Sequence, residues 1–192
     1  MKLLKERILK DGRAAGEGIL KVDTFLNHQI DPELMEKIGE EFYEKFKDKK
    51  ITKILTIEAS GIAIAVFVAK AFGVPLVFAK KTMSKNMDGE ILSASVMSYT
   101  KGLVYIINVA KKFINKDDNI LLIDDFLANG SALLGLAEIV QLGGADLAGA
   151  GIVIEKSYQP GRKRAEAAGI DVCSLVEIEE IKEGKVVFKE ES

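Results

Sequence analysis

Runs of apolar residues alternate with longer helical segments through the middle of this sequence, and the alternation limits the folds that the chain can adopt. Strands are predicted at residues 51–57, 74–79, 119–123 and 149–154, and helices at residues 60–72 and 130–142. The strand segments are largely continuous in their apolar character, which is typical of strands buried on both faces. We therefore expect an α/β fold in which a parallel sheet is flanked by helices.

The segments on either side of this alternation are less regular. Asp31 followed by Pro32 predicts the start of a helix that continues to about residue 46. Further helices are predicted at residues 3–10 and 161–168, strands at 103–110, 172–176 and 186–188, a glycine-rich break at 11–18 and a polar segment at 80–102. We expect one domain, with an amino-terminal cover at residues 1–50, a core at 51–157 and small carboxy-terminal hood elements at 158–192.

The composition argues against several classes of function. Lys and Arg number 27 and Asp and Glu 29 among 192 residues, and a net charge of −2 does not suit an electrostatic clamp for DNA. The lone Cys173 favours a reducing compartment, and we interpret it as a buried small apolar residue. The lone His28 makes Ser-His-Asp chemistry and histidine-bound zinc poor hypotheses. With no membrane-spanning run and no signal sequence in view, we expect a cytoplasmic location.

Two adjacent carboxylates, Asp124 and Asp125, end the apolar strand at residues 119–123. They are followed by a loop of small residues, which are Ala128, Asn129, Gly130, Ser131 and Ala132. Neighbouring carboxylates repel each other, so their pairing indicates a cationic or hydroxyl-rich ligand. The backbone N–H groups of a small loop at the start of a helix can bind an anion. The pattern favours sugar hydroxyls or a metal beside one phosphate, and an ordinary strand–turn–helix junction is the alternative.

This segment resembles the ribose-phosphate signature of type I phosphoribosyltransferases, in which four apolar residues and two acids precede a small phosphate loop. The resemblance implies the fold of that family, with Asp124 and Asp125 as catalytic acids that hold the ribose hydroxyls of phosphoribosyl pyrophosphate. Residues 128–132 would bind its 5′-phosphate. The family's usual Thr-Gly-x-Thr loop is replaced here by Asn-Gly-Ser-Ala at residues 129–132. Ala128 stands where hypoxanthine-guanine enzymes have an Asp base, so no general base is assigned.

A second loop of small residues, formed by Glu58, Ala59, Ser60 and Gly61, follows the strand at residues 51–57. Small residues let the backbone approach an anion closely. The resemblance makes these four residues the pyrophosphate loop. The plain alternative is that Ser60 only caps the helix that follows.

Lys80 and Lys81 directly follow the strand at residues 74–79, where either could neutralise pyrophosphate as it leaves. The polar segment at about residues 82–101 resembles the flexible lid of the family, which would exclude water from the reaction. A solvated hairpin is the alternative, and the sequence does not distinguish the roles of the two lysines.

The resemblance extends over essentially the whole chain and implies a pocket for the base. In bacterial purine enzymes of the family, the base lies between the amino-terminal region and the segment after the strand at residues 149–154. The matching positions are Leu20, Asn27 and Lys156. Lys156 offers only hydrogen-bond donors, which favours a purine with oxo groups over adenine. The plain alternatives are a surface lysine and a turn asparagine.

The resemblance therefore implies purine salvage, with transfer of the phosphoribosyl group to xanthine and release of xanthosine 5′-monophosphate and pyrophosphate. It also implies Mg²⁺ bound mainly through phosphoribosyl pyrophosphate and water, a homodimer, and no nucleic-acid or membrane partner. Guanine, hypoxanthine and adenine are alternative acceptors. A non-enzymatic sensor of phosphoribosyl pyrophosphate, such as the effector domain of a purine repressor, and a nucleotide-binding structural domain are alternatives of other classes.

Overall fold

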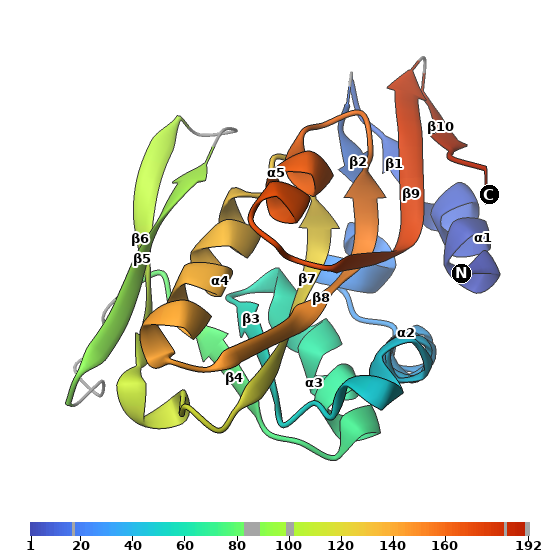
Figure 1. Ribbon diagram of the computed structural model, residues 1–192. Helices are drawn as coiled ribbons and strands as arrows, with labels where there is room; N and C mark the ends of the chain where they lie inside the picture. Colours follow the sequence, from blue (N-terminus) through green and yellow to red (C-terminus); the bar gives the residue numbers. More distant parts are fainter. Residues whose placement is uncertain (17, 83–88, 99–101, 183, 191–192) are drawn as a thin grey trace.

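A six-stranded sheet in the order β10-β9-β8-β7-β3-β4 forms the centre of the computed structural model, which describes residues 1–16, 18–82, 89–98, 102–182 and 184–190 (Figure 1). Its strands are β3 (Lys53–Ile57), β4 (Leu76–Ala79), β7 (Asn119–Leu127), β8 (Asp146–Lys156), β9 (Val172–Lys182) and β10 (Lys185–Phe188). Neighbouring strands are parallel, except that β10 is antiparallel to β9. The predicted parallel α/β sheet is confirmed.

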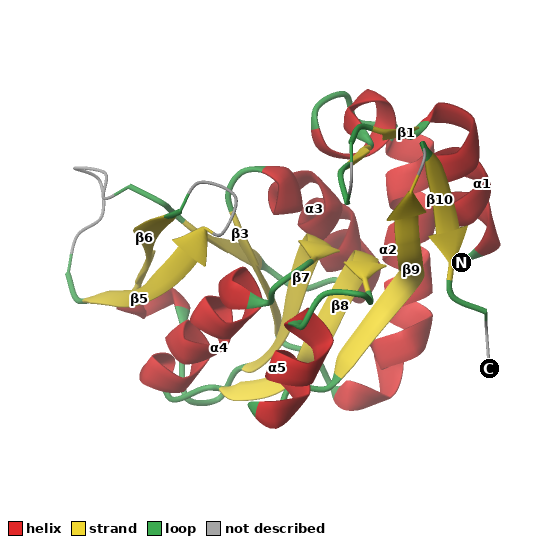
Figure 2. Cartoon of the chain, turned by 90° about the horizontal axis from the view of Figure 1, so that it is seen from above, coloured by secondary structure: helices red, strands yellow, loops and turns green. Residues whose placement is uncertain are grey.

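Helices cover both faces of this sheet (Figure 2). One face carries α1 (Lys2–Asp11), α2 (Pro32–Phe46) and α3 (Ser60–Phe72), and the other carries α4 (Ser131–Gly143) and α5 (Gly161–Ala167). Successive side chains of a strand point to opposite faces, so β7 contributes to two apolar cores. Leu121 and Ile123 pack with the first group of helices, whereas Ile120 and Leu122 pack with the second.

The predicted helix ends are confirmed by their backbone geometry. The side chain of Asp31 accepts a hydrogen bond from the backbone N–H of Leu34 at 3.2 Å, so it caps α2 at its amino end. Gly73 ends α3 and Gly144 ends α4, both with positive φ, which glycine adopts without steric cost.

Several elements were not predicted or were given the wrong limits. A two-stranded hairpin of β1 (Arg13–Ala14) and β2 (Leu20–Lys21) lies partly in the expected break, and a single π-helical turn, Asp23–Asn27, follows it. Short 3₁₀ turns occupy Lys47–Lys49 and Lys111–Phe113. Strand β5 (Ile91–Ser98) was not predicted, whereas β6 (Leu103–Ala110) has the limits of the strand predicted at residues 103–110. The two form a second hairpin that stands beside the main sheet and packs on α4 (Figure 1). The small Ser and Ala side chains of β5 hide its alternation from a sequence pattern.

Strand β7 also continues through the two carboxylates that were expected to follow it. Its pairing with β8 extends to Phe126 opposite Ile154 and Leu127 opposite Glu155. Asp124 and Asp125 are therefore held by sheet hydrogen bonding and not by a loop. Strand β9 likewise extends beyond residue 176 to Lys182, because its acidic second half pairs with β10. In the described part of the chain, no helix is both long and apolar enough to cross a membrane.

Candidate active site

The two sequence motifs meet where the order of the sheet reverses. From β3 the chain moves outward to β4, whereas β7, β8 and β9 follow one another in the opposite direction. Strands β3 and β7 are parallel neighbours, with Leu55 opposite Leu122. A crevice at the carboxyl ends of such strands is where open α/β sheets bind ligands. The loop after β3 and the carboxylates of β7 therefore lie at one edge of the sheet, as expected.

Gly61 allows this approach to be close. A Cβ atom at residue 61 would lie 2.2 Å from Oγ1 of Thr56 and 3.4 Å from Oδ1 of Asp124. Any side chain there would push α3 away from the sheet. The absence of a side chain thus brings the first turn of α3 next to Asp124.

Asp124 and Asp125 are both buried, with 6% and 8% of their surfaces exposed. Burial raises the pKa of Asp124 well above its ordinary value, the neighbouring charge of Asp125 raises it further, and Lys81 opposes these effects. The backbone N–H of Asp125 donates to Oδ1 of Asp124 at 3.0 Å, and that of Phe126 donates to Oδ1 of Asp125 at 3.0 Å. Two adjacent buried carboxyl groups suit a ligand that carries positive charge or hydroxyl groups.

The two carboxylates point to opposite sides of the sheet, as neighbours in a strand must. Asp125 faces the amino-terminal cover, where Nδ2 of Asn27 donates to its Oδ2 at 3.2 Å. Asn27 was predicted as a base contact, and the structure places it against the acid pair. Asp124 faces the side of α4 and the β5–β6 hairpin. Burial of Tyr105 raises the pKa of its phenol, and the charge of Asp124 raises it further.

The predicted phosphate loop lies between β7 and α4. Gly130 has a φ of +83°, and Ser131 is the first residue of α4. The backbone N–H of Ser131 donates to Oδ1 of Asn129 at 2.9 Å. The loop lines a cavity of about 170 Å³ that it shares with Asp124 and Tyr105. Tyr105 was missed from the sequence, where nothing separates it from the other residues of its predicted strand.

Ser60 does not cap the helix that follows β3, so the plain alternative for this loop is wrong. Ala59 is the capping residue of α3, Ser60 is the first helical residue, and no side chain caps the helix. The Glu58–Ala59 peptide bond is cis. Oε1 of Glu58 accepts from the backbone N–H of Lys81 at 2.6 Å, which connects this loop to the segment after β4.

The two lysines after β4 point to different surroundings. The ammonium group of Lys81 lies 5.3 Å from the ring centre of Tyr105, and its charge lowers the pKa of Asp124. Lys80 instead forms a backbone bridge with Asn108 and lies over the ring of Phe78, in a separate groove. Lys81 is therefore the lysine on the side of the acid pair. Of the expected lid, residues 83–88 and 99–101 lie outside the described residues, and β5 occupies part of the remainder.

Of the three residues matched to a base pocket, Lys156 lies near Phe126 and Asn27 contacts Asp125. Lys156, at the end of β8, donates to the carbonyl of Gly18 at 2.8 Å, and its ammonium lies 5.5 Å from the ring centre of Phe126. Burial lowers the pKa of Lys156. Leu20, in β2, is buried and lies close to Gly18 in the sequence. The side chain of Asn27 donates a hydrogen bond to Asp125. The half-buried ring of Phe126 was missed from the sequence because it reads as an ordinary strand residue.

The remaining residues singled out from the sequence are the lone histidine and the lone cysteine. His28 is exposed, and Cys173 is half-buried, not fully buried as interpreted, although burial raises its pKa. Among the residues that the structure describes, no group of three or more His, Cys, Asp or Glu side chains could hold a metal ion.

The amino-acid sequence matches a known family model and is similar to named proteins of other organisms. Residues 22–189 match the family model described as a phosphoribosyl transferase domain. The chain is 54% identical over 189 residues to a protein of Clostridium novyi named xanthine phosphoribosyltransferase, a match that covers 98% of this chain and 100% of the relative. A protein of the same name from Latilactobacillus sakei is 54% identical over 192 residues, covering 100% of this chain and 98% of the relative.

Solved structures show the same fold. The structure of adenine phosphoribosyltransferase from Giardia lamblia with 9-deazaadenine has a TM-score of 0.77 at 22% identity, and the match covers 91% of this chain and 97% of that one. The enzyme of that name from Rhodothermus marinus has a TM-score of 0.76 at 23% identity, covering 93% and 100%. At these identities the likeness concerns the fold alone, and it agrees with the expected type I fold.

Proposed function

The chain belongs to the phosphoribosyl transferase family, and on that premise we propose that it transfers the phosphoribosyl group of phosphoribosyl pyrophosphate to xanthine. The products are xanthosine 5′-monophosphate and pyrophosphate, a reaction of purine salvage. One observation carries the site assignment: the buried pair Asp124 and Asp125 adjoins two small-residue loops at the reversal point of the sheet. The relatives named xanthine phosphoribosyltransferase support the choice of acceptor.

The residues around this point suit a dissociative transfer. The bond from C1′ to the pyrophosphate oxygen lengthens first, positive charge develops on the ribose, and a purine ring nitrogen then forms the new bond to C1′. Asp124 and Asp125 hold the ribose hydroxyls and oppose the developing charge. Residues 128–132 bind the 5′-phosphate, and residues 58–61 with Lys81 bind the pyrophosphate. We assign no general base, because Ala128 offers none.

Mg²⁺ would be held mainly by the substrate. The available protein donors near the crevice are two hard carboxylates, which fits a cation that keeps several waters and few protein ligands. When bound, the ion neutralises charge on the pyrophosphate. The protein's own part is to position the ribose through Asp124 and Asp125.

Base recognition is proposed for the pocket around Phe126. Its half-buried ring offers a face on which a purine can stack. The ammonium of Lys156 already donates to the Gly18 carbonyl, so it is directed inward and can donate to a purine oxo group. Adenine has an amino group in place of the 6-oxo group, and a donor cannot pair with a donor. Asn27 would then connect the base pocket to Asp125.

The proposal includes a cytoplasmic homodimer built as one catalytic domain. Val104 and Ile106 share the outer face of β6 with Asn108, and all three side chains point the same way. Asn108 lines an apolar groove of about 330 Å³ with Phe78 and Phe113. Exposed apolar side chains therefore lie on both the hairpin and the neighbouring sheet edge, and such surface can mark a protein contact. A second copy of the chain is the proposed occupant.

The test is product formation by the purified chain with xanthine, phosphoribosyl pyrophosphate and Mg²⁺. We expect xanthosine 5′-monophosphate and pyrophosphate in equal amounts, and a loss of turnover of about 10²–10³-fold in both Asp124→Asn and Asp125→Asn with the fold retained. Unchanged turnover in these variants would refute the ribose assignment. Tight binding of phosphoribosyl pyrophosphate without turnover would support the sensor alternative, for which binding to labelled purine-operator DNA is the further measurement.

A further inference from the structure

Helix α5 lies directly behind the proposed phosphate loop. The backbone N–H of Gly161 donates to the carbonyl of Ala128 at 2.9 Å. A Cβ atom at Gly161 would lie 2.5 Å from that carbonyl oxygen, and one at Gly130 would lie 3.1 Å from the carbonyl oxygen of Gly161. Both glycines are therefore needed for the helix and the loop to approach this closely, so a shift of one would displace the other.

Arg164 of α5 bonds to the loop itself. Its Nη1 donates to the carbonyl of Asn129 at 2.7 Å and to Oγ of Ser131 at 3.4 Å. In the described part of the chain, Arg164 is the cationic side chain that bonds directly to residues 128–132. The described lining of the adjacent cavity contains the loop but not Arg164, so the guanidinium acts on the loop from its outer side.

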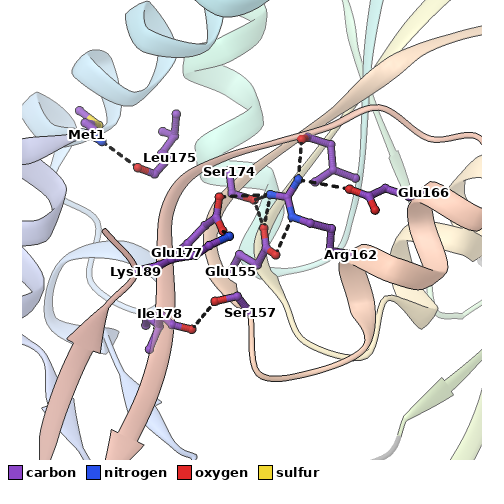
Figure 3. A network of polar contacts seen from close by, with 11 residues as sticks. Met1, Glu155, Ser157, Arg162, Glu166, Ser174, Leu175, Glu177, Ile178 and Lys189 are labelled. Atoms are coloured by element: carbon purple, nitrogen blue, oxygen red, sulfur yellow. Dashed lines mark hydrogen bonds and ion pairs between the residues drawn. The ribbon is translucent and has the colours of Figure 1, made fainter. Parts of the chain in front are cut away.

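A network of charged groups fixes the start of the same helix (Figure 3). Arg162 donates through Nε and Nη2 to the two carboxylate oxygens of Glu155, which is 1% exposed, and Ser174 also donates to that carboxylate. Nη1 of Arg162 donates to the carbonyl of Val172. A helix of seven residues has little stability alone. These contacts with β8 and β9 hold α5 in place, and α5 in turn holds Arg164.

We propose that Arg164 is a positioning residue for the 5′-phosphate of phosphoribosyl pyrophosphate. Its guanidinium holds the Asn129 carbonyl toward α5, so that this oxygen cannot turn toward an anion bound at the loop. Its charge, close to a half-buried loop, adds favourable electrostatic energy for a phosphate dianion. The Asn-Gly-Ser-Ala loop lacks two hydroxyls that the usual Thr-Gly-x-Thr loop of the family carries. Arg164 compensates for their loss. The inference rests on the proposed function.

The test compares Arg164→Ala with Lys163→Ala, which removes one charge from an exposed position of the same helix. Two probes are titrated separately: ribose 5-phosphate, which carries the phosphate in question, and inorganic pyrophosphate, which does not. We expect Arg164→Ala to weaken ribose 5-phosphate binding about tenfold to a hundredfold and to raise the KM for phosphoribosyl pyrophosphate similarly. Pyrophosphate binding and the KM for xanthine should change less than twofold, and Lys163→Ala should resemble the wild type.

A conservative variant separates positioning from a general effect on folding. Arg164→Lys keeps the charge but loses the planar guanidinium that reaches two acceptors, so it should recover only part of the lost affinity. The inference is overturned if Arg164→Ala binds ribose 5-phosphate like the wild type, or if both probes weaken equally. Failure of the proposed function would look different: the wild type itself would form no xanthosine 5′-monophosphate.

Discussion

Asp124 contributes to the site at a cost to the stability of the folded chain. Its carboxyl group is buried beside Asp125, and both effects raise its pKa in the folded protein. A carboxyl with a raised folded pKa gives its full contribution to stability below the unfolded pKa, and that contribution is lost as the pH rises through the folded pKa. Such a cost is expected where a site is arranged for a ligand and not for the free protein.

The first prediction is that Asp124→Asn raises the melting temperature while lowering turnover. At pH 7–8 we expect a rise of at least 2–4 °C, which corresponds to about 1 kcal/mol for a chain of this size. The gain should shrink as the pH falls toward about 4, where the unfolded carboxyl is protonated as well. Thermal unfolding followed by circular dichroism across this range is the measurement. A variant that is less stable than the wild type at pH 8 would contradict the assigned cost.

The second prediction concerns Lys156. Lys156→Ala should weaken binding of oxo purines about tenfold to a hundredfold, the range expected for a hydrogen bond from a charged donor. Phosphoribosyl pyrophosphate should bind nearly as well as to the wild type, because its proposed contacts lie at the loops after β3 and β7. Lys182→Ala, an exposed lysine of β9, is the matched control. Equal losses for both ligands, measured by calorimetry, would remove Lys156 from the base pocket.

For single residues, the sequence predicted which residue types form the candidate site better than it predicted which side chains contact them. Adjacent acids and small-residue loops are visible as residue types, so Asp124, Asp125 and both loops could be identified as candidates. Arg164 and Tyr105 could not, because each meets the site only through folding of a distant segment. Lys80 and Lys81 differ only in side-chain direction, which no composition or spacing encodes.

The limits of helices were predicted well where an apolar segment begins after an aspartate or ends at a glycine. Helices α2, α3 and α4 begin and end within one residue of expectation for this reason. Strands were less predictable at their carboxyl ends. Hydrogen bonding to β8 continues β7 through two acids, and pairing with β8 and then β10 continues β9 through Glu177 and Glu180. Such pairing depends on neighbours that are remote in sequence.

The third prediction tests how closely α3 must approach the sheet. Gly61→Ala would place a methyl group 2.2 Å from the Thr56 hydroxyl oxygen, so we expect lower stability and weaker binding of pyrophosphate. Among the described residues, that buried hydroxyl has no hydrogen-bond partner, so Thr56→Ala alone should cost little. The double variant should recover much of the stability lost in Gly61→Ala. A double-mutant cycle by denaturant unfolding measures the coupling, and purely additive effects would contradict the steric account.

At the scale of the whole molecule, the amino-terminal cover completes the site. Asn27 bonds Asp125, and the carbonyl of Gly18 accepts from Lys156, so two residues of the first 30 contact the ends of β7 and β8. The sequence did not predict these contacts, because they join segments that are far apart along the chain. The proposed base pocket therefore depends on segments from opposite halves of the chain.

The fourth prediction concerns assembly. Ile106→Glu places a charge on the apolar face of the β5–β6 hairpin, where this side chain is 52% exposed. We expect it to convert a dimer into a monomer, as measured by analytical ultracentrifugation. Leu9→Glu, at a position on α1 that is 64% exposed, is the matched control and should leave the dimer intact. A wild type that sediments as a monomer at micromolar concentration would rule out this interface.

Selection of an oxo purine by this family member can be measured by comparing four acceptors. The kcat/KM of the wild-type chain is determined for xanthine, guanine, hypoxanthine and adenine at saturating phosphoribosyl pyrophosphate and Mg²⁺. We predict that xanthine gives the highest value and that adenine lies at least about a hundredfold below it, because the Lys156 ammonium would face the amino group of adenine in place of an oxo group. A kcat/KM for adenine that equals or exceeds that for xanthine would contradict the account.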